Sequence, residues 1–199
     1  MNGADDIGKL KGALRAAARE RRAMFFRANG AAVAKKLCEF MPELYLPHNA
    51  VIAGYAQRGS ELDPLPVLTY LAGRGHVLAL PAAVAKDQNL VFRTWKPGDP
   101  LEPDAIGRPA PLPSSPTLVP SVLFMPMTAF DGQGRRLGSG FNLFGPTIAD
   151  LRAQGVALQV VGLGFSIQEE RAVPFEPSDV MLDGVVTERG VVWFRDKKS

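Results

Sequence analysis

The sequence has few of the residues on which several protein classes depend. Its one cysteine, Cys38, excludes an internal disulfide and a cysteine-based zinc site. The two histidines, His48 and His76, lie far apart and have no partner at metal-ligand spacing, so we interpret both as structural. The net charge of +3 over 199 residues is too small to indicate nucleic-acid binding as a global property.

Long apolar runs are also missing, because no stretch approaches the roughly 18 residues of a membrane span. The first residues, M-N-G-A-D-D, are acidic and unlike a secretion signal. Together with the single cysteine, these features predict a soluble, unprocessed cytoplasmic protein without nucleic-acid or membrane partners. The length suits a single domain covering residues 1–199, and we expect a monomer.

The positive charge that is present gathers near the N-terminus. Apolar residues there recur at helical spacing after Asp5 and Asp6, which predicts an N-capped amphipathic helix. A second helix is expected at about residues 31–41, ending before Pro42. One face of the first helix carries a basic stripe, formed by Lys11, Arg15, Arg19 and Arg22. By itself such a stripe is more typical of a solvated face than of a binding site.

Short apolar runs predict buried parallel strands at residues 51–55, 76–80, 122–125 and 158–165, with a crossover helix at 64–73. A half-buried or edge strand is expected at 90–95, and a final hairpin from 185–187 and 191–194. Eight prolines between residues 96 and 120 indicate a long loop without regular structure. The pattern predicts a three-layer, Rossmann-like α/β domain with a mainly parallel, mixed sheet and an antiparallel C-terminal hairpin.

A glycine-rich segment at residues 130–150 lies between a predicted strand and a predicted helix that starts at Thr147. Backbone N–H groups freed by glycine, together with Arg135 and Arg136, can bind phosphate oxygens. The segment contains neither a P-loop nor a G-x-G-x-x-G motif after a strand, so a mobile, solvent-exposed loop is an equal alternative on this pattern alone. Glu61 and Asp63 follow another strand, at the edge where ligands of α/β sheets bind.

Several separated motifs occur in the order that is typical of one protein family. They are K-x-x-L-R (Lys11, Leu14, Arg15), Tyr55 followed by Glu61-x-Asp63, F-R-x-W (Phe92, Arg93, Trp95), P-G-D (97–99), A-F-D-x-x-G-x-R-L-G-x-G (129–140), G-x-x-F-x-x-Q (162–168), Asp179, Leu182-Asp183 and Thr187-Glu188. The series resembles the 5-formyltetrahydrofolate cyclo-ligase family, also called methenyltetrahydrofolate synthetase, over nearly the whole chain.

The resemblance implies an ATP-dependent ligase. ATP phosphorylates the formyl oxygen of 5-formyltetrahydrofolate, the second folate nitrogen attacks the activated carbon, and phosphate leaves to give 5,10-methenyltetrahydrofolate. ATP and Mg²⁺ are the expected cofactors, and the folate is the small-molecule partner. Phosphoryl transfer needs positioning and charge neutralisation rather than a protein nucleophile.

The resemblance also implies roles for particular residues. ATP would be bound by Lys11, Arg15, Arg136, Leu137, Gly138, Ser139 and Gly140, with Arg136 also catalytic. The folate would be bound by Arg15, Tyr55, Glu61 and Ser139, with Glu61 accepting the pterin N–H groups. Magnesium would be held by Asp179.

One departure concerns the end of the glycine-rich segment. The family usually continues G-x-G-x-Y-Y-D-R, whereas Gly145 and Pro146 stand here where the metal-binding Asp and the Arg are expected, and Asn142 stands where a glycine is. Asp131 and Asp150 are the acids that could substitute. The sequence therefore allows a second hypothesis, a catalytically impaired relative that binds folate or nucleotide.

A third hypothesis belongs to another class. The anion-binding loop would also suit a sugar-phosphate isomerase or acyl-transfer protein, but the sequence lacks a convincing catalytic base or nucleophilic glutamate for either reaction.

Overall fold

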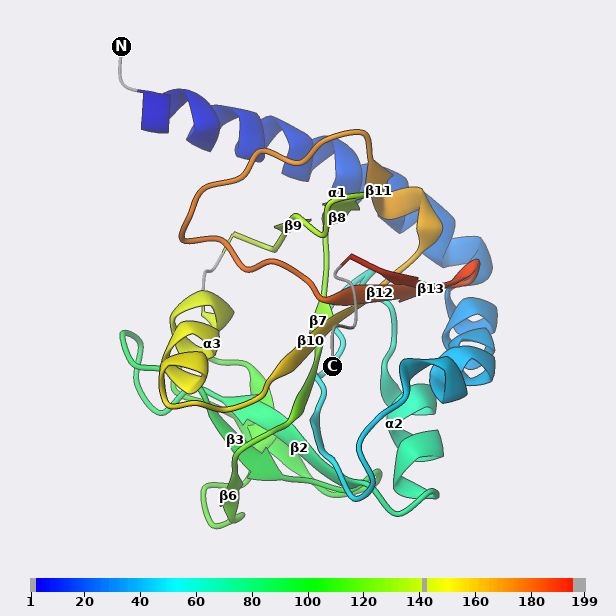
Figure 1. Ribbon diagram of the computed structural model, residues 1–199, viewed down its shortest axis with the longest axis vertical. Helices are drawn as coiled ribbons and strands as arrows, with labels where there is room; N and C mark the ends of the chain where they lie inside the picture. Colours follow the sequence, from blue (N-terminus) through cyan, green and yellow to red (C-terminus); the bar gives the residue numbers. More distant parts are fainter. Residues whose placement is uncertain (1–2, 141–142, 195–199) are drawn as a thin grey trace.

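The computed structural model describes residues 3–140 and 143–194, which build an eight-stranded sheet with helices packed around it (Figure 1). The strand order is β13-β12-β10-β7-β1-β2-β3-β6. The strand bounds are β1 (Val51–Ala53), β2 (Val77–Ala82), β3 (Val91–Thr94), β6 (Thr117–Leu118), β7 (Val122–Pro126), β10 (Gln159–Leu163), β12 (Gly184–Thr187) and β13 (Gly190–Trp193). The five strands from β12 to β2 pair in parallel, and both edges are antiparallel. The predicted mixed α/β fold and its C-terminal hairpin are confirmed.

The central strands are apolar on both faces, because each face is covered. On β7, Phe124 contributes to the core shared with α1 (Gly3–Lys36), the 3₁₀ helix η1 (Leu37–Leu44) and α2 (Leu65–Ala72). Leu123 and Met125 contribute to a second core on the opposite face, which α3 (Phe144–Ala153) covers. This burial of consecutive residues explains why the strands appear as continuous apolar runs in the sequence.

The N-terminal helix differs from the prediction. One helix, α1, runs from Gly3 to Lys36, so Asp5 and Asp6 lie inside it and the expected break before Ala31 does not occur. The ring of Phe26 occupies the space where a side chain at residue 30 would lie, since a Cβ on Gly30 would come within 2.6 Å of it. Pro42 lies within η1 rather than after an α-helix. Proline has no N–H for an α-helical hydrogen bond, and the tighter 3₁₀ form replaces the expected helix there.

The proline-rich segment is also more regular than predicted. It contains β6 and a two-stranded hairpin, β4 (Leu101–Pro103) and β5 (Pro109–Pro111), in which Glu102 pairs with Ala110 and Pro103 with Pro109. Proline is tolerated in a strand where its missing N–H would have faced away from the partner. The prediction of a loop without regular structure was therefore wrong.

The first half of the glycine-rich segment is paired too. β8 (Ala129–Asp131) pairs with β9 (Arg136–Leu137) and with β11 (Glu169–Glu170), which follows the short 3₁₀ helix η2 (Ser166–Gln168). This small sheet lies beside α1 in Figure 1. Within the described ranges, no helix combines the length and apolar character needed to cross a membrane.

Candidate active site

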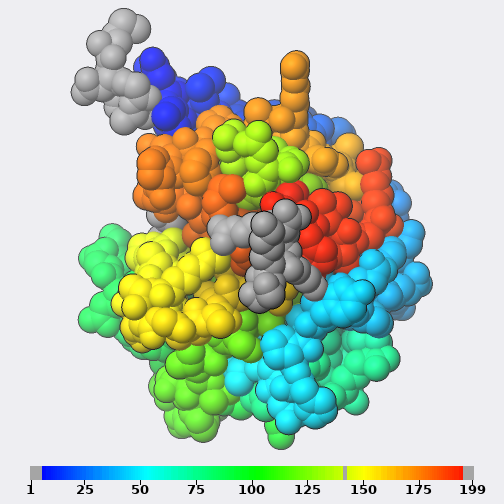
Figure 2. Space-filling view, in the orientation of Figure 1, coloured from blue at the N-terminus to red at the C-terminus, as the bar shows by residue number. Residues whose placement is uncertain are grey.

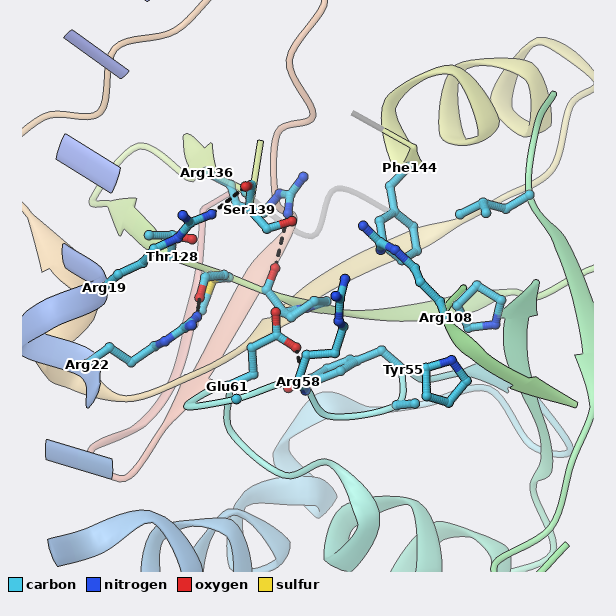
Figure 3. Close-up of a pocket in the computed structure, with 18 of the residues that line it drawn as sticks. Arg19, Arg22, Tyr55, Arg58, Glu61, Arg108, Thr128, Arg136, Ser139 and Phe144 are labelled. Carbon is cyan, nitrogen blue, oxygen red and sulfur yellow. Dashed lines mark hydrogen bonds between the residues drawn. The ribbon is translucent and has the colours of Figure 1, made fainter. Parts of the chain in front are cut away.

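A cavity of about 350 Å³ opens where the strand order reverses, between the carboxyl ends of β1 and β7 (Figure 3). This is the position at which open α/β sheets bind ligands, and the volume lies within the range of small-molecule sites. Its lining comes from α1, the segment after β1, the β4–β5 hairpin and the glycine-rich segment. The lining residues are Arg19, Arg22, Tyr55, Ala56, Arg58, Gly59, Glu61, Pro81, Leu90, Asp104, Arg108, Pro109, Pro126, Met127, Thr128, Arg136, Gly138, Ser139 and Phe144.

The wall that follows β1 is fixed by hydrogen bonds between near neighbours. The buried Tyr55 hydroxyl donates to the carbonyl of Leu62 at 2.8 Å, and Gln57 Nε2 donates to the carbonyl of Glu61 at 2.7 Å. The Arg58 N–H donates to Glu61 Oε2 at 3.1 Å. These bonds close the segment into a compact turn that directs Glu61 into the cavity.

Opposing effects set the protonation of Glu61. Burial raises the pKa of its carboxyl above the ordinary value of 4.5, while the charges of Arg22 and Arg58 lower it by a smaller amount. The Tyr55 hydroxyl has a pKa well above its ordinary value because it is buried and lies near Glu61. Glu61 is therefore a partly desolvated acceptor, suited to binding paired N–H donors.

The glycine-rich segment forms the facing wall. Arg136 donates from Nη1 to the carbonyl of Pro126 at 3.1 Å, whereas its buried Nε has no hydrogen-bond partner within the described chain. Burial lowers the pKa of Arg136 to about 10, against the opposing effect of Asp179, so the guanidinium stays charged at neutral pH. A Cβ at Gly138 would lie 3.1 Å from this guanidinium, and glycine permits the close approach.

The basic stripe of α1 packs against this wall. Arg15 Nε donates to the carbonyl of Gly138 at 3.1 Å, and Arg19 donates to the carbonyl of Ser139. Arg22, which is 7% exposed, donates to the carbonyl of Met127 at 2.8 Å. The interpretation of the stripe as a merely solvated face is therefore wrong. The helix holds the glycine-rich segment beside the cavity.

At the start of the stripe, Lys11 is buried against two carboxylates. Its Nζ lies 2.6 Å from Glu176 Oε2 and also bonds Asp179. Burial lowers the pKa of Lys11, but the two carboxylates outweigh it and leave a net rise. Figure 2 shows the segment that carries these acids, in orange, lying against the N-terminal part of α1.

The carboxylates of Asp179 and Glu176 suit a hard cation, because both already converge on one positive charge. Within residues 3–140 and 143–194, no group of three or more acidic, histidine or cysteine side chains could hold a metal. Asp179 lies close enough to Arg136 to influence its pKa, although it does not line the cavity.

The acids considered as substitutes do not reach the cavity. Asp131 is 2% exposed and accepts bonds from the N–H groups of Gln133 and Val173, both at 2.9 Å. Asp150 is exposed on α3 and accepts a bond from Gln154. Both carboxylates have hydrogen-bond partners, and neither lines the cavity. Asn142 lies outside the described residues.

Five of the predicted site residues line the cavity, namely Tyr55, Glu61, Arg136, Gly138 and Ser139. Lys11, Arg15, Leu137, Gly140 and Asp179 lie outside its lining. Arg15 nevertheless bonds the loop, and Leu137 packs in a small core with Ala18.

Sequence reasoning missed Arg58, Asp104, Arg108 and Phe144, which also line the cavity. The sequence could have indicated Arg58, because it follows β1 and lies three residues before Glu61. No sequence pattern indicated Arg108, because its position depends on a hairpin in a segment that the prolines suggested was irregular.

Comparison with solved structures supports the fold. A 5,10-methenyltetrahydrofolate synthetase from Aquifex aeolicus is similar, with a TM-score of 0.74 and 23% identity over 96% of this chain and 95% of that one. A 5,10-methenyltetrahydrofolate synthetase from Mycoplasma pneumoniae has a TM-score of 0.68 and 17% identity over 89% of this chain and 98% of that one.

Sequence comparison identifies the family. A search of curated proteins gave no match. The model of the 5-formyltetrahydrofolate cyclo-ligase family matches residues 8–188, which cover both walls of the cavity, the basic stripe of α1 and Asp179. The chain therefore belongs to the 5-formyltetrahydrofolate cyclo-ligase family.

Proposed function

We propose that the protein converts 5-formyltetrahydrofolate to 5,10-methenyltetrahydrofolate with consumption of ATP, as a cytoplasmic monomer. The observation that supports this most is the meeting of two unlike walls at one cavity. Glu61 lies on one wall, and Arg136 with the backbone of Gly138 and Ser139 lies on the other. An acceptor for N–H groups thus faces a basic, glycine-rich segment, as a reaction between a pterin and a triphosphate requires.

On the first wall, Glu61 accepts the pterin N–H groups in its ionised form. The neighbouring Arg22 and Arg58 favour that form, while burial opposes it. Tyr55 holds the turn through its bond to Leu62 and gives the wall a rigid aromatic surface. The pterin is thereby oriented with its formyl group towards the glycine-rich wall.

On the second wall, Arg136 and the N–H groups near Gly138 and Ser139 bind the phosphates. The formyl oxygen attacks the γ-phosphorus and ADP leaves; the second folate nitrogen then attacks the formyl carbon, loses its proton and expels phosphate. Arg136 suits this role because it lines the cavity and its guanidinium stays charged at neutral pH.

Asp179, with Glu176 beside it, would hold magnesium. When bound, the ion neutralises phosphate charge and orients the triphosphate. Lys11, whose Nζ bonds both carboxylates, would contribute positive charge to the binding of the triphosphate.

The test is product formation. Purified protein is mixed with ATP, magnesium and 5-formyltetrahydrofolate, and the near-ultraviolet absorbance of the methenyl product is followed. Growth of this absorbance that requires both ATP and the folate is the expected result. No product at any magnesium concentration would overturn the proposal.

A second candidate function is binding of folate or nucleotide without turnover. Gly145 and Pro146 lie in the first turn of α3 and provide neither a carboxylate nor a guanidinium. The double variant Gly145→Asp/Pro146→Arg separates the two functions. A large gain in turnover would indicate that the natural chain is impaired, whereas unchanged turnover would count against impairment. A sugar phosphate that fails to bind would dispose of the isomerase hypothesis.

A further inference from the structure

The β4–β5 hairpin ends in a tightly bonded turn beside the cavity. Asp104 Oδ1 accepts from the N–H groups of Ile106 at 3.0 Å and Arg108 at 2.8 Å. Asp104 Oδ2 accepts from the N–H of Ala83, just past β2, at 2.8 Å. Gly107 has a φ of 74°, which glycine adopts without strain. One carboxylate thus closes the turn and fastens it to the sheet, which fixes the backbone from which the Arg108 side chain extends.

Arg108 and Arg58 reach into the cavity from different segments, as Figure 3 shows. Burial lowers the pKa of Arg108, and the charge of Arg58 lowers it further, so the two guanidiniums repel each other. Among the described residues, the lining carries five guanidiniums against the carboxylates of Glu61 and Asp104. Such an excess of positive charge in a partly desolvated cavity favours a multiply charged anion.

The position of Arg108 indicates which anionic group it contacts. Arg58 and Arg108 both act on the pKa of Glu61, so they lie near the group proposed to hold the pterin. The glutamate carboxylates of a folate are separated from the pterin by an aminobenzoyl ring, so they extend away from Glu61. The anion that lies between the pterin and the glycine-rich wall is the phosphoryl group in transfer.

We propose that Arg108, extending from the turn that Asp104 holds and supported by Arg58, contacts the transferring phosphoryl group from the side of the β4–β5 hairpin. This inference rests on the proposed function and names a further catalytic residue for it. As the formyl oxygen bonds to the γ-phosphorus and the bond to ADP breaks, negative charge spreads over the equatorial oxygens. Arg108 donates hydrogen bonds to these oxygens and exchanges no proton.

Turnover of three variants gives the first test. Arg108→Ala is expected to lower kcat about 100-fold with a change of less than about threefold in the KM for the folate, because a charge-assisted donor to the transition state is lost. Arg108→Lys should retain part of the rate. Arg74→Ala is the matched control, since Arg74 lies over the Tyr70 ring at 4.4 Å and outside the cavity lining. Equal kcat in Arg108→Ala and the control would overturn the proposal.

Binding gives a second test that needs no turnover. Calorimetry compares ADP alone with ADP plus aluminium fluoride, a mimic of the transferring phosphoryl group, both with the folate present. Arg108→Ala should lower the affinity for ADP with aluminium fluoride at least about tenfold. It should lower the affinity for ADP alone less than about twofold. An equal loss for both, or no loss for either, would contradict the proposed contact.

A third comparison tests the folate tail as the alternative anion. The two probes are 5-formyltetrahydrofolate and 5-formyl-6-methyltetrahydropterin, which lacks the glutamate. If Arg108→Ala lowers the binding affinity only for the glutamate-bearing probe, Arg108 contacts the glutamate tail and the proposal fails. If the natural protein forms no methenyl product, the proposed function fails, while the fluoride comparison still decides whether Arg108 contacts the phosphoryl group.

Discussion

The two walls of the cavity are held in place in different ways. The wall after β1 is closed by bonds between residues three to seven positions apart, such as Arg58 to Glu61 and Tyr55 to Leu62. The glycine-rich wall is held by residues more than 100 positions away, such as Arg15 at Gly138. The first wall is therefore closed mainly by its own turn, with one bond from α1, Arg22 Nε to Ser60 Oγ at 3.2 Å, whereas the second depends more heavily on the docking of α1.

The two walls have different proposed functions. The local wall presents the acceptor that is proposed to recognise the folate, and the long-range wall presents the groups that are proposed to bind the triphosphate. Changes in the local wall should affect folate recognition, and changes at the contact of α1 should affect stability and nucleotide binding. The variants below test this separation, from the largest expected effect to the smallest.

The largest effect is expected from Glu61→Gln. Glutamine offers one acceptor where the carboxylate offers two, so one pterin N–H group is left facing a donor. We expect kcat/KM for the folate to fall at least about 100-fold, with ATP affinity unchanged. Asp63→Asn is the control, because Asp63 accepts from the Leu65 N–H and does not line the cavity. A comparable loss in both variants would indicate a general disturbance of the turn.

On the facing wall, Arg136→Ala removes a charge-assisted contact worth about 1.5 to 3 kcal/mol. ATP affinity should fall by a factor of about 10 to 150, measured by calorimetry, while folate affinity changes little. Arg135→Ala is the matched control, since the Arg135 guanidinium lies over the Phe175 ring at 5.8 Å and outside the lining. Unchanged ATP affinity in Arg136→Ala would show that this wall does not bind the phosphates.

The docking of α1 is tested by Lys11→Met. The change leaves the carboxylates of Glu176 and Asp179 facing an apolar side chain. These carboxylate side chains are 36% and 22% exposed, so hydration reduces the loss of stability. The free energy of unfolding should fall by about 1 to 3 kcal/mol in urea denaturation. Lys9→Met, at an exposed position of the same helix, should stay within about 0.5 kcal/mol of the natural protein. Equal stabilities of the two variants would contradict a structural role for Lys11.

A smaller effect is expected from Tyr55→Phe, which leaves the buried carbonyl of Leu62 without its donor. The unfolding free energy should fall by about 1 kcal/mol, and folate affinity should fall with it as the turn loosens. Tyr70→Phe keeps the ring beneath Arg74 and should change neither quantity. If Tyr55→Phe reduced only ATP affinity, the assignment of the two walls would be wrong.

The smallest effect concerns pH. Burial raises the pKa of Glu61 in the folded protein, so between pH 4.5 and that raised value the folded state binds more protons than the unfolded state. The contribution of Glu61 to stability is therefore full at lower pH and is lost as the pH rises through this window. Folate affinity should change in the opposite direction and rise with pH. Both dependences should disappear in Glu61→Gln, and a pH profile identical to that of the natural protein would contradict the assignment.

The sequence predicted the local wall well and the long-range contacts poorly. The apolar run before Tyr55 and Glu61 after it lie within one strand and turn, so position along the chain was sufficient for them, whereas Asp63 does not line the cavity. By contrast, Lys11 meets Asp179 across 168 positions, and no pattern in the sequence indicates that pair.

Two further failures have local causes. The helix α1 continues through Gly30, where the Phe26 ring occupies the space that a side chain would fill, and the glycine in the sequence suggested a break instead. The prolines of the β4–β5 hairpin stand at positions that a strand tolerates. The number of prolines alone therefore gave no indication of the turn that carries Arg108.

The central claim is that one cavity brings the triphosphate and the pterin together between these walls. A crystal structure with ATP analogue, magnesium and 5-formyltetrahydrofolate bound tests it most directly. We expect the terminal phosphates within hydrogen-bonding distance of Arg136 and of the backbone at Gly138 or Ser139, and the pterin N–H groups on Glu61. A triphosphate bound away from the glycine-rich wall, or a pterin that does not contact Glu61, would contradict the account.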